Sequence, residues 1–266
     1  FDPSDPSIMY FGCDGGVYKS TDGGGSFLNV NDGLVTTQFY PGVSVSPSDS
    51  NVTMGGLQDN GSVRYLGSPM WRPVLGADGG WTAINSADKN IMYGEFQYLT
   101  LWRSTNGGGS FTPINSGLPS GSGNTNFIPP FTISYSNPDV LYAGARNVYK
   151  TTNKGSSWLP TGSFNGTNVS AISASWTSAD TVMGATGGGG TNNPPLFRVY
   201  ASTNGGAVWT NVTGLLPNRY PTDIEFDPSD SRIAYVTFSG YASGHLFKTT
   251  NIGQTWTDIS ANLPDI

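Results

Sequence analysis

The chain has 266 residues with 37 Gly and 18 Pro, and average usage of about 7% Gly predicts only about half as many glycines. Its formal net charge is −6, and its 12 Lys and Arg are spread singly, which argues against a nucleic-acid partner because such surfaces need clustered cations. No run approaches about 18 apolar residues, which excludes a transmembrane helix, and the single Cys13 and single His245 exclude an internal disulfide and most zinc chemistry.

The N-terminal residues 1–6 contain neither a basic start nor an apolar stretch, so no signal peptide is visible. The abundance of Ser, Thr, Asn and Gly is nevertheless typical of a secreted protein whose leader lies elsewhere or has been removed. Residues 1–5 (FDPSD) match residues 226–230, which follow the first strand of the last repeat. The first repeat therefore lacks its inner strand. We expect a fragment of a longer protein that is secreted, extracellular or attached to the cell surface.

A short glycine-rich turn recurs five times along the chain. The copies span residues 20–27, 104–111, 151–158, 202–209 and 249–256. Their Asp or Asn residues follow one another at intervals of 84, 47, 51 and 47 residues. The first interval equals two periods of 42, so one copy has decayed near residue 64. There, residues 62–65 and Trp71 keep the strand pattern but lose the Asp-Gly turn.

Each repeat contains four short runs of β-branched and aromatic residues bounded by turn residues, which predict strands. In the last repeat these runs are 222–226, 232–238, 245–249 and 255–259. Four strands in about 42–50 residues are typical of a propeller blade. We predict an all-β protein, a single β-propeller segment over residues 1–266 with four-stranded antiparallel blades. It would belong to a seven-bladed ring, or to a six-bladed ring closed by a missing strand, with the remainder elsewhere in the same protein. The six blades are expected at residues 1–38, 39–79, 80–125, 126–166, 167–218 and 219–266.

The recurring turn is interpreted as architectural. Its Asp or Asn side chain is expected to accept hydrogen bonds from backbone N–H groups two residues onward, and its aromatic residue to pack between blades. One copy carries Asp and four carry Asn, so we expect no carboxylate required for catalysis or calcium there. The structural residues are Asp22, Asn106, Asn153, Asn204 and Asn251, with the aromatic residues Phe27, Phe111, Trp158, Trp209 and Trp256.

This turn resembles the Asp box, or BNR repeat, of sialidases, xyloglucanase-type glycoside hydrolases and sortilin-like receptors, and the resemblance covers the whole chain. Residues 56–61 (GLQDNG) and 76–80 (GADGG) look more like a secreted bacterial group related to sortilin and xyloglucanase propellers. The resemblance implies a β-propeller and leaves the function open. Sialidase chemistry is disfavoured because it needs an arginine cluster, and only Arg146 and Arg219 lie outside the predicted strands.

Loops on the face opposite the turns gather most of the scarce polar groups. In an antiparallel blade, the loop between the second and third strands and the link to the next blade share one end. Candidate ligand-binding residues on this face are Gln58, Asp59, Asn60, Asp78, Glu95, Gln97 and Tyr98. Asp59, Asp78 and Glu95 come from adjacent blades, so they are candidates to hold a ligand or to form the carboxylate pair of a glycosidase. The competing interpretation is that they only make turns.

Two functions are therefore compared. The first is a secreted, non-catalytic propeller that binds carbohydrate or an extracellular protein, with no cofactor and no catalytic or metal-ligating residue assigned. The alternative is a fragment of a xyloglucanase-like glycoside hydrolase, in which the resemblance implies aspartates acting as acid and base in a cleft between two propellers. A calcium ion at Asp59 and Asp78 is a further hypothesis, since hard cations take oxygen ligands. A sugar-stacking aromatic beside a carboxylate pair, with Tyr98 or Tyr241 as candidates, would discriminate the two functions.

Overall fold

The computed structural model describes residues 1–13, 16–33, 37–164, 167–188 and 197–265. These residues form strands and turns, and none of them lies in a helix. The strands make six antiparallel sheets, each with its strands in chain order. No helix of a length and apolarity that would cross a membrane occurs among the described residues. The all-β prediction is confirmed.

The sheets are the blades of the predicted repeat. Blade one contains β1 (Met9–Cys13), β2 (Gly16–Ser20) and β3 (Leu28–Asn29), and blade two contains β4 (Ser44–Ser46), β5 (Asp49–Leu57), β6 (Gly61–Leu66) and β7 (Arg72–Leu75). Blade three contains β8 (Thr82–Ile84), β9 (Met92–Phe96), β10 (Thr100–Ser104) and β11 (Thr112–Pro113), and blade four contains β12 (Phe131–Ile133), β13 (Leu141–Gly144), β14 (Asn147–Thr151) and β15 (Leu159–Ser163). Blade five contains β16 (Val169–Ala174), β17 (Val182–Thr186), β18 (Arg198–Ser202) and β19 (Thr210–Asn211), and blade six contains β20 (Pro221–Phe226), β21 (Ala234–Phe238), β22 (Leu246–Thr249) and β23 (Thr257–Asp258). Among the described residues, the sheet of blade one has three strands, whereas the other sheets have four.

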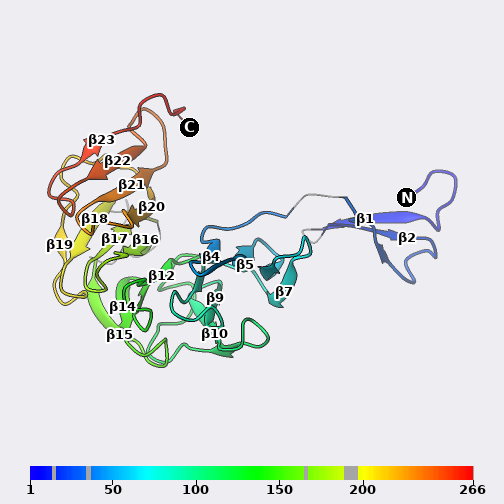
Figure 1. Ribbon diagram of the computed structural model, residues 1–266. Helices are drawn as coiled ribbons and strands as arrows, with labels where there is room; N and C mark the ends of the chain where they lie inside the picture. Colours follow the sequence, from blue (N-terminus) through cyan, green and yellow to red (C-terminus); the bar gives the residue numbers. More distant parts are fainter. Residues whose placement is uncertain (14–15, 34–36, 165–166, 189–196, 266) are drawn as a thin grey trace.

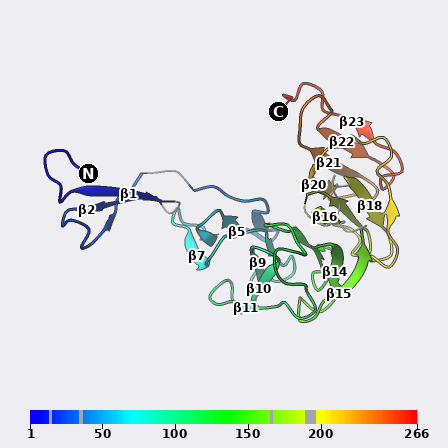
Figure 2. The same cartoon turned by 180° about the vertical axis from the view of Figure 1, so that it is seen from behind.

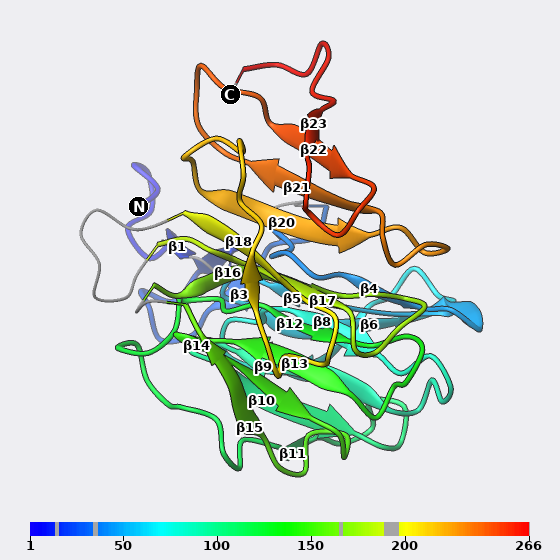
Figure 3. The same cartoon turned by 90° about the vertical axis from the view of Figure 1, so that its left-hand side faces the viewer.

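Blades two to six follow one another around an open arc (Figure 1). The inner strands β4, β8, β12, β16 and β20 contact their neighbours in that order along the concave side of the arc. The view from behind shows blade one lying apart from the arc (Figure 2). From the side of blades four to six, blade six lies above blade five, and blade five lies above blade four (Figure 3). The concave side therefore brings one strand from each of five blades together.

The apolar core lies between neighbouring blades. Met183 and Val199 of blade five pack with Ile224, Phe226 and Val236 of blade six, and each is at most 1% exposed. Successive residues of a strand point to opposite faces of the sheet, and in blades three to five a neighbouring blade covers each face. Full burial of side chains of this size stabilises the fold by about 1.5–3 kcal/mol each. The arc therefore depends on contacts between sheets.

The recurring turn has the same hydrogen bonds in all five copies. In blade four, Asn153 Oδ1 accepts from the backbone N of Ser157 at 3.0 Å and from the Thr151 hydroxyl at 2.7 Å. The Thr151 hydroxyl oxygen in turn accepts from the backbone N of Gly155 at 3.1 Å. The same bonds to the Asp or Asn oxygen recur at Asp22, Asn106, Asn204 and Asn251. The expected partner two residues onward is wrong. The N–H lies four residues onward, because two consecutive residues at positive φ carry the backbone around a wider turn; they are Gly-Gly in three copies, Lys154-Gly155 in blade four and Ile252-Gly253 in blade six.

The aromatic residue that ends four of these turns packs against the preceding blade. The indole Nε1 of Trp158 donates to Ile114 O and that of Trp256 donates to Val212 O, each at 2.8 Å. Trp209 meets Phe164 edge to face, and Phe111 packs against the blade-two core. Packing between blades is confirmed for these four residues. The prediction of packing between blades is wrong for Phe27. This residue is 47% exposed, and its ring meets that of Phe11, which belongs to the same sheet.

We predict that Asn153→Asp leaves the free energy of unfolding within about 0.5 kcal/mol of the wild type, whereas Asn153→Ala lowers it by about 1–2 kcal/mol. An Asp keeps the acceptor oxygen, as Asp22 does toward Ser26 N at 2.8 Å. An Ala leaves the Ser157 N–H and the Thr151 hydroxyl without this acceptor. Urea unfolding of the two variants checks the prediction, and equal losses would contradict it.

Candidate functional site

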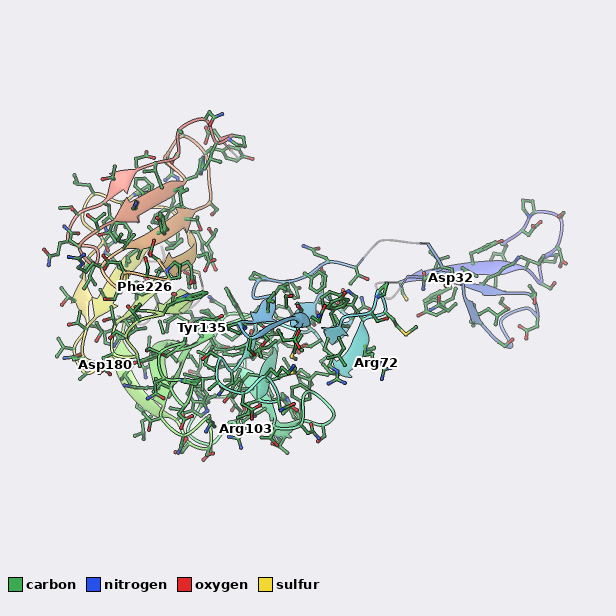
Figure 4. The ribbon with its side chains drawn as sticks, viewed as in Figure 1. Asp32, Arg72, Arg103, Tyr135, Asp180 and Phe226 are labelled. Atoms are coloured by element: carbon green, nitrogen blue, oxygen red, sulfur yellow. The ribbon has the colours of Figure 1, made fainter. Side chains whose placement is uncertain are left out.

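A pocket of about 350 Å³ lies where the five inner strands meet, and we call it the channel site. It is lined by residues of β4, β8, β12, β16 and β20 and of the segments next to them. The polar and aromatic residues of its wall include Trp81, Tyr135, Ser173, Trp176, Asp223 and Glu225. Figure 4 labels Tyr135 on the concave side of the arc, whereas Arg103 and Asp180 lie toward its convex rim. Side chains from four blades therefore face one space.

Two aromatic rings from adjacent blades stack at the edge of the channel site. Tyr135 follows β12 of blade four and Trp176 follows β16 of blade five, and their ring centroids are 4.1 Å apart at an interplanar angle of 20°. Both residues are half-buried. The Tyr135 backbone oxygen also accepts from the Ser86 hydroxyl of blade three at 3.1 Å. The stack is thus held by three blades and offers flat apolar area to a ligand.

Two carboxylates of β20 stand beside the stacked rings. Glu225 Oε1 accepts from the Trp176 indole at 2.8 Å, and Glu225 Oε2 accepts from the Ser173 hydroxyl at 3.2 Å. Asp223 lies two residues away on the same strand, which separates the two Cα atoms by about 7 Å. Asp223 Oδ1 accepts from the backbone N of Ile224 at 2.9 Å. Residues two positions apart on a strand point to the same face, so both carboxyl groups line the channel site from β20.

The channel wall raises the pKa of both carboxyl groups. Each side chain reaches solvent, yet the surrounding protein removes part of its hydration, and this desolvation is the largest cause for Asp223 and for Glu225. The hydrogen bonds from Trp176 and Ser173 lower the pKa of Glu225, while the charge of Asp223 raises it. The Tyr135 hydroxyl has a raised pKa as well, from burial first and then from the charge of Glu225. A carboxyl with a raised pKa is suited to donating a proton.

Trp81 of blade three lines the channel site, and its backbone is bonded to Glu95. The backbone N of Trp81 donates to Glu95 Oε1 at 2.9 Å, and the backbone N of Gly80 donates to Glu95 O at 3.0 Å. On its other side, the Trp81 ring lies against Gly42, whose φ of 92° and lack of a Cβ let the ring approach the backbone. The position of the indole is therefore fixed by two neighbouring blades.

Glu95 is a structural residue, which corrects its predicted place in a ligand-binding cluster. It is 0% exposed, so no ligand from solvent reaches it. A Cβ at Gly80 would collide with the carboxyl group, which shows how closely the backbone covers it. Burial raises the pKa of Glu95 well above its ordinary value, and its Oε2 has no hydrogen-bond partner among the described residues. Desolvation without a cation nearby favours the neutral acid.

Asp59, Asp78 and Gln97 do come together in the loops between blades two and three. Asp78 Oδ1 accepts from the backbone N of Asp59 at 2.9 Å, and Asp78 Oδ2 accepts from Gln97 Nε2 at 3.0 Å. Asp59 has a φ of 58°, in the left-handed region that Asp tolerates in turns. The two oxygens of Asp78 thus tie a blade-two turn to blade three, and Glu95 is not part of this contact.

The other predicted residues flank this contact. Asn60 Nδ2 donates to Gln58 O at 3.0 Å within the exposed turn. The Tyr98 ring meets Phe127 edge to face at 5.5 Å, and the backbone N of Tyr98 donates to Phe127 O at 2.9 Å. No group of three His, Cys, Asp or Glu suited to a metal occurs among the described residues. The calcium hypothesis at Asp59 and Asp78 and the ligand-binding role of the exposed loop residues stay predictions.

Sequence reasoning missed the channel residues Tyr135, Trp176, Asp223 and Glu225. One signal was available, since the run 222–226 places two acidic residues at alternate positions of a predicted inner strand. Glu225 is also one of only two Glu residues in the chain. The approach of Trp176 to Glu225 joins residues 49 positions apart, and no local pattern reports it.

Comparisons with known proteins agree with a propeller. No protein-family model matches the chain. A xyloglucanase of Hypocrea jecorina (strain QM6a) is 24% identical over 276 residues, which cover 84% of this chain and 32% of that protein. The chain thus spans about a third of the length of this curated relative.

Solved structures resemble the chain over nearly its whole length. The GH74 enzyme of Niastella koreensis matches with a TM-score of 0.68 and 19% identity, over 94% of this chain and 43% of that chain. YCF48 from Cyanidioschyzon merolae matches with a TM-score of 0.57 and 14% identity, over 96% of this chain and 82% of that chain. These likenesses confirm the β-propeller fold.

We predict that Glu95→Gln changes how the free energy of unfolding varies with pH. The folded protein keeps the Glu95 proton above the ordinary pKa of 4.5, so this contribution is fully present below that pH. It is lost as the pH rises toward the folded-state pKa, with a slope of up to about 1.4 kcal/mol per pH unit. The neutral Gln removes this slope. Urea unfolding of both proteins from pH 5 to pH 9 is the measurement, and parallel curves would count against it.

Proposed function

We propose that this propeller binds a β-linked glucan chain such as xyloglucan in the channel site, as the substrate-binding part of a xyloglucanase-like glycoside hydrolase. The observation that carries the proposal is the stacked Tyr135–Trp176 pair bonded to Glu225. Aromatic rings beside carboxylates are the chemistry that sugar recognition uses, since the ring covers the apolar face of a sugar and the oxygens accept from its hydroxyls. The sequence similarity to a xyloglucanase supports this substrate class.

The hydrolytic form of the proposal assigns chemistry to the two carboxyl groups of β20. Hydrolysis of a glycosidic bond needs one carboxyl that carries a proton and a second that is ionised. Desolvation raises the pKa of both Asp223 and Glu225, and the charge of Asp223 raises that of Glu225 further. In this proposal, Glu225 is the proton donor and Asp223 is the ionised partner. The protein then acts outside the cell, where a polysaccharide is accessible.

Binding without hydrolysis is the second candidate, and one observation favours it. Both oxygens of Glu225 already accept hydrogen bonds, from Trp176 and from Ser173. A proton donor in a hydrolase must turn toward the glycosidic oxygen, and these bonds hold the Glu225 carboxyl toward the wall. The same bonds fix the indole as a platform, which serves recognition alone.

Calorimetric titration of the chain with xyloglucan oligosaccharides tests the binding. We expect Trp176→Ala to weaken the affinity at least about tenfold, because the stack and the Glu225 contact are lost together. Trp71→Ala is the matched control, since Trp71 is 36% exposed on blade two, away from the channel site. Equal losses in both variants, or no binding by the wild type, would overturn the proposal.

A reducing-sugar assay on xyloglucan separates the two candidates. If the channel site hydrolyses the polymer, Glu225→Gln and Asp223→Asn each abolish the release of reducing ends while the affinity for oligosaccharides changes less than tenfold. If wild-type protein binds oligosaccharides and releases no reducing ends, the binding candidate stands and the hydrolytic assignment of Asp223 and Glu225 is rejected.

A further inference from the structure

One register position of the third strand carries a cation in five of the six blades. The position is defined by the pairing between the second and third strands, in which the residue at this position of the third strand lies directly opposite one residue of the second strand. The residues are Lys19, Arg64, Arg103, Lys150 and Lys248, with Ala201 in blade five. Their opposite residues are Tyr10, Met54, Tyr93, Tyr142 and Tyr235. Blade two is therefore the one cation-bearing blade with Met in place of Tyr.

Three of these cations lie over the opposite tyrosine. The Nζ atoms of Lys19, Lys150 and Lys248 each lie 5.5 Å from the ring centroid, and Lys150 also faces Asp180 at 3.6 Å. Attraction between a cation and the face of an aromatic ring explains this arrangement. The position thus normally holds a cation whose charge is compensated within the protein.

Arg103 has a different partner, in the next blade. Its Nη1 donates to Lys154 O at 2.7 Å, in the glycine-rich turn of blade four. Figure 4 shows Arg103 toward the convex rim of the arc. Arg103 is thus a structural link between blades three and four.

Arg64 has neither kind of partner. Met54 offers it no ring face, and its guanidinium group has no hydrogen bond or ion pair within the described part of the chain. Its Nη1 lies near Gly107 of the next turn, at the place where Arg103 finds the Lys154 oxygen, without bonding to it. Arg64 is half-buried and its Nε is enclosed, so the side chain is held in place while its donors remain unused. An arginine in this state is prepared for an oxyanion.

Arg64 lines a groove of about 370 Å³ between blades two and three, on the side of the glycine-rich turns. The size falls in the range of small-molecule sites, about 300–1,000 Å³. Lys89 and Asp49 line the same groove and pair with each other at 2.6 Å, and the amide side chains of Asn51 and Asn90 border it. Arg72 lies directly across from Arg64 on β7 and adds a further positive charge to this edge of blade two.

We propose that this groove binds a carboxylated sugar residue, such as a uronic acid, with Arg64 holding the carboxylate. The guanidinium fork matches a carboxylate through two parallel hydrogen bonds. The amides of Asn51 and Asn90 and the Asp49 carboxylate, whose charge is paired with Lys89, are acceptors for sugar hydroxyls, which a bare inorganic anion does not have. The site lies apart from the channel site and does not depend on the proposed function.

Titration of the protein with digalacturonate at pH 7 and low salt tests this assignment by calorimetry. We expect saturable binding that Arg64→Ala weakens at least tenfold and that Arg64→Lys weakens less. Arg103→Ala is the matched control, because it removes an equivalent charge whose Nη1 is already bonded to Lys154 O, and it should change the affinity by less than threefold. The Arg64→Lys variant keeps the test valid if Arg64→Ala does not fold.

Three results would overturn the proposal. They are absence of digalacturonate binding, equal binding of neutral cellobiose or of inorganic phosphate, and equal losses in the Arg64 and Arg103 variants. Trp176→Ala should leave digalacturonate binding intact, so failure of this site and failure of the channel site are distinguishable.

Discussion

The hydrogen bond from a backbone N–H to the Asp or Asn oxygen four residues earlier fixes the turn on which the rest of the fold depends. The turn joins the third strand to the outer strand in each of the five blades that contain it, and it places an aromatic ring at the start of the outer strand. The ring reaches the preceding blade, where Trp158 and Trp256 each bond to a backbone oxygen. Because these rings pack between neighbouring sheets, the geometry of the turn determines the spacing between the sheets. This spacing in turn determines which residues meet in the channel site.

The sequence predicts the fold well because its signals are local and repeated. The run 222–226 corresponds to β20 (Pro221–Phe226), and the run 245–249 to β22 (Leu246–Thr249). The run 255–259 shrinks to the two residues of β23, because the outer strand pairs on one side only. The partner of the Asp or Asn oxygen differs from the predicted one, since the general rule for Asx turns does not include the two residues at positive φ that widen these turns.

The candidate site is harder to predict from the sequence than the fold, since it depends on which charged side chains are buried and which are exposed to solvent. Glu95 and Glu225 occupy similar alternating runs, yet one is sealed beneath Gly80 and the other opens into the channel. Asp78 accepts from the backbone N of Asp59 within blade two, while its bond with Gln97 depends on the contact between two blades. Residues tens of positions apart, such as Trp176 and Glu225, share no pattern that a single sequence displays.

The glycine-rich turns also bear on the chemical ageing of the protein. Asn106-Gly107 and Asn204-Gly205 are the dipeptides most prone to deamidation, in which the glycine nitrogen attacks the amide carbon and expels ammonia. Here the two glycine N–H groups are held by Asn90 O at 2.9 Å and Asp180 O at 2.8 Å, away from that attack. The fraction that does hydrolyse to aspartate retains the acceptor oxygen, as Asp22 demonstrates. The turns that build the blades therefore hold these two glycine nitrogens away from the attack and can accept an aspartate product, whereas an isoaspartate product, with its extra backbone methylene, would disrupt them.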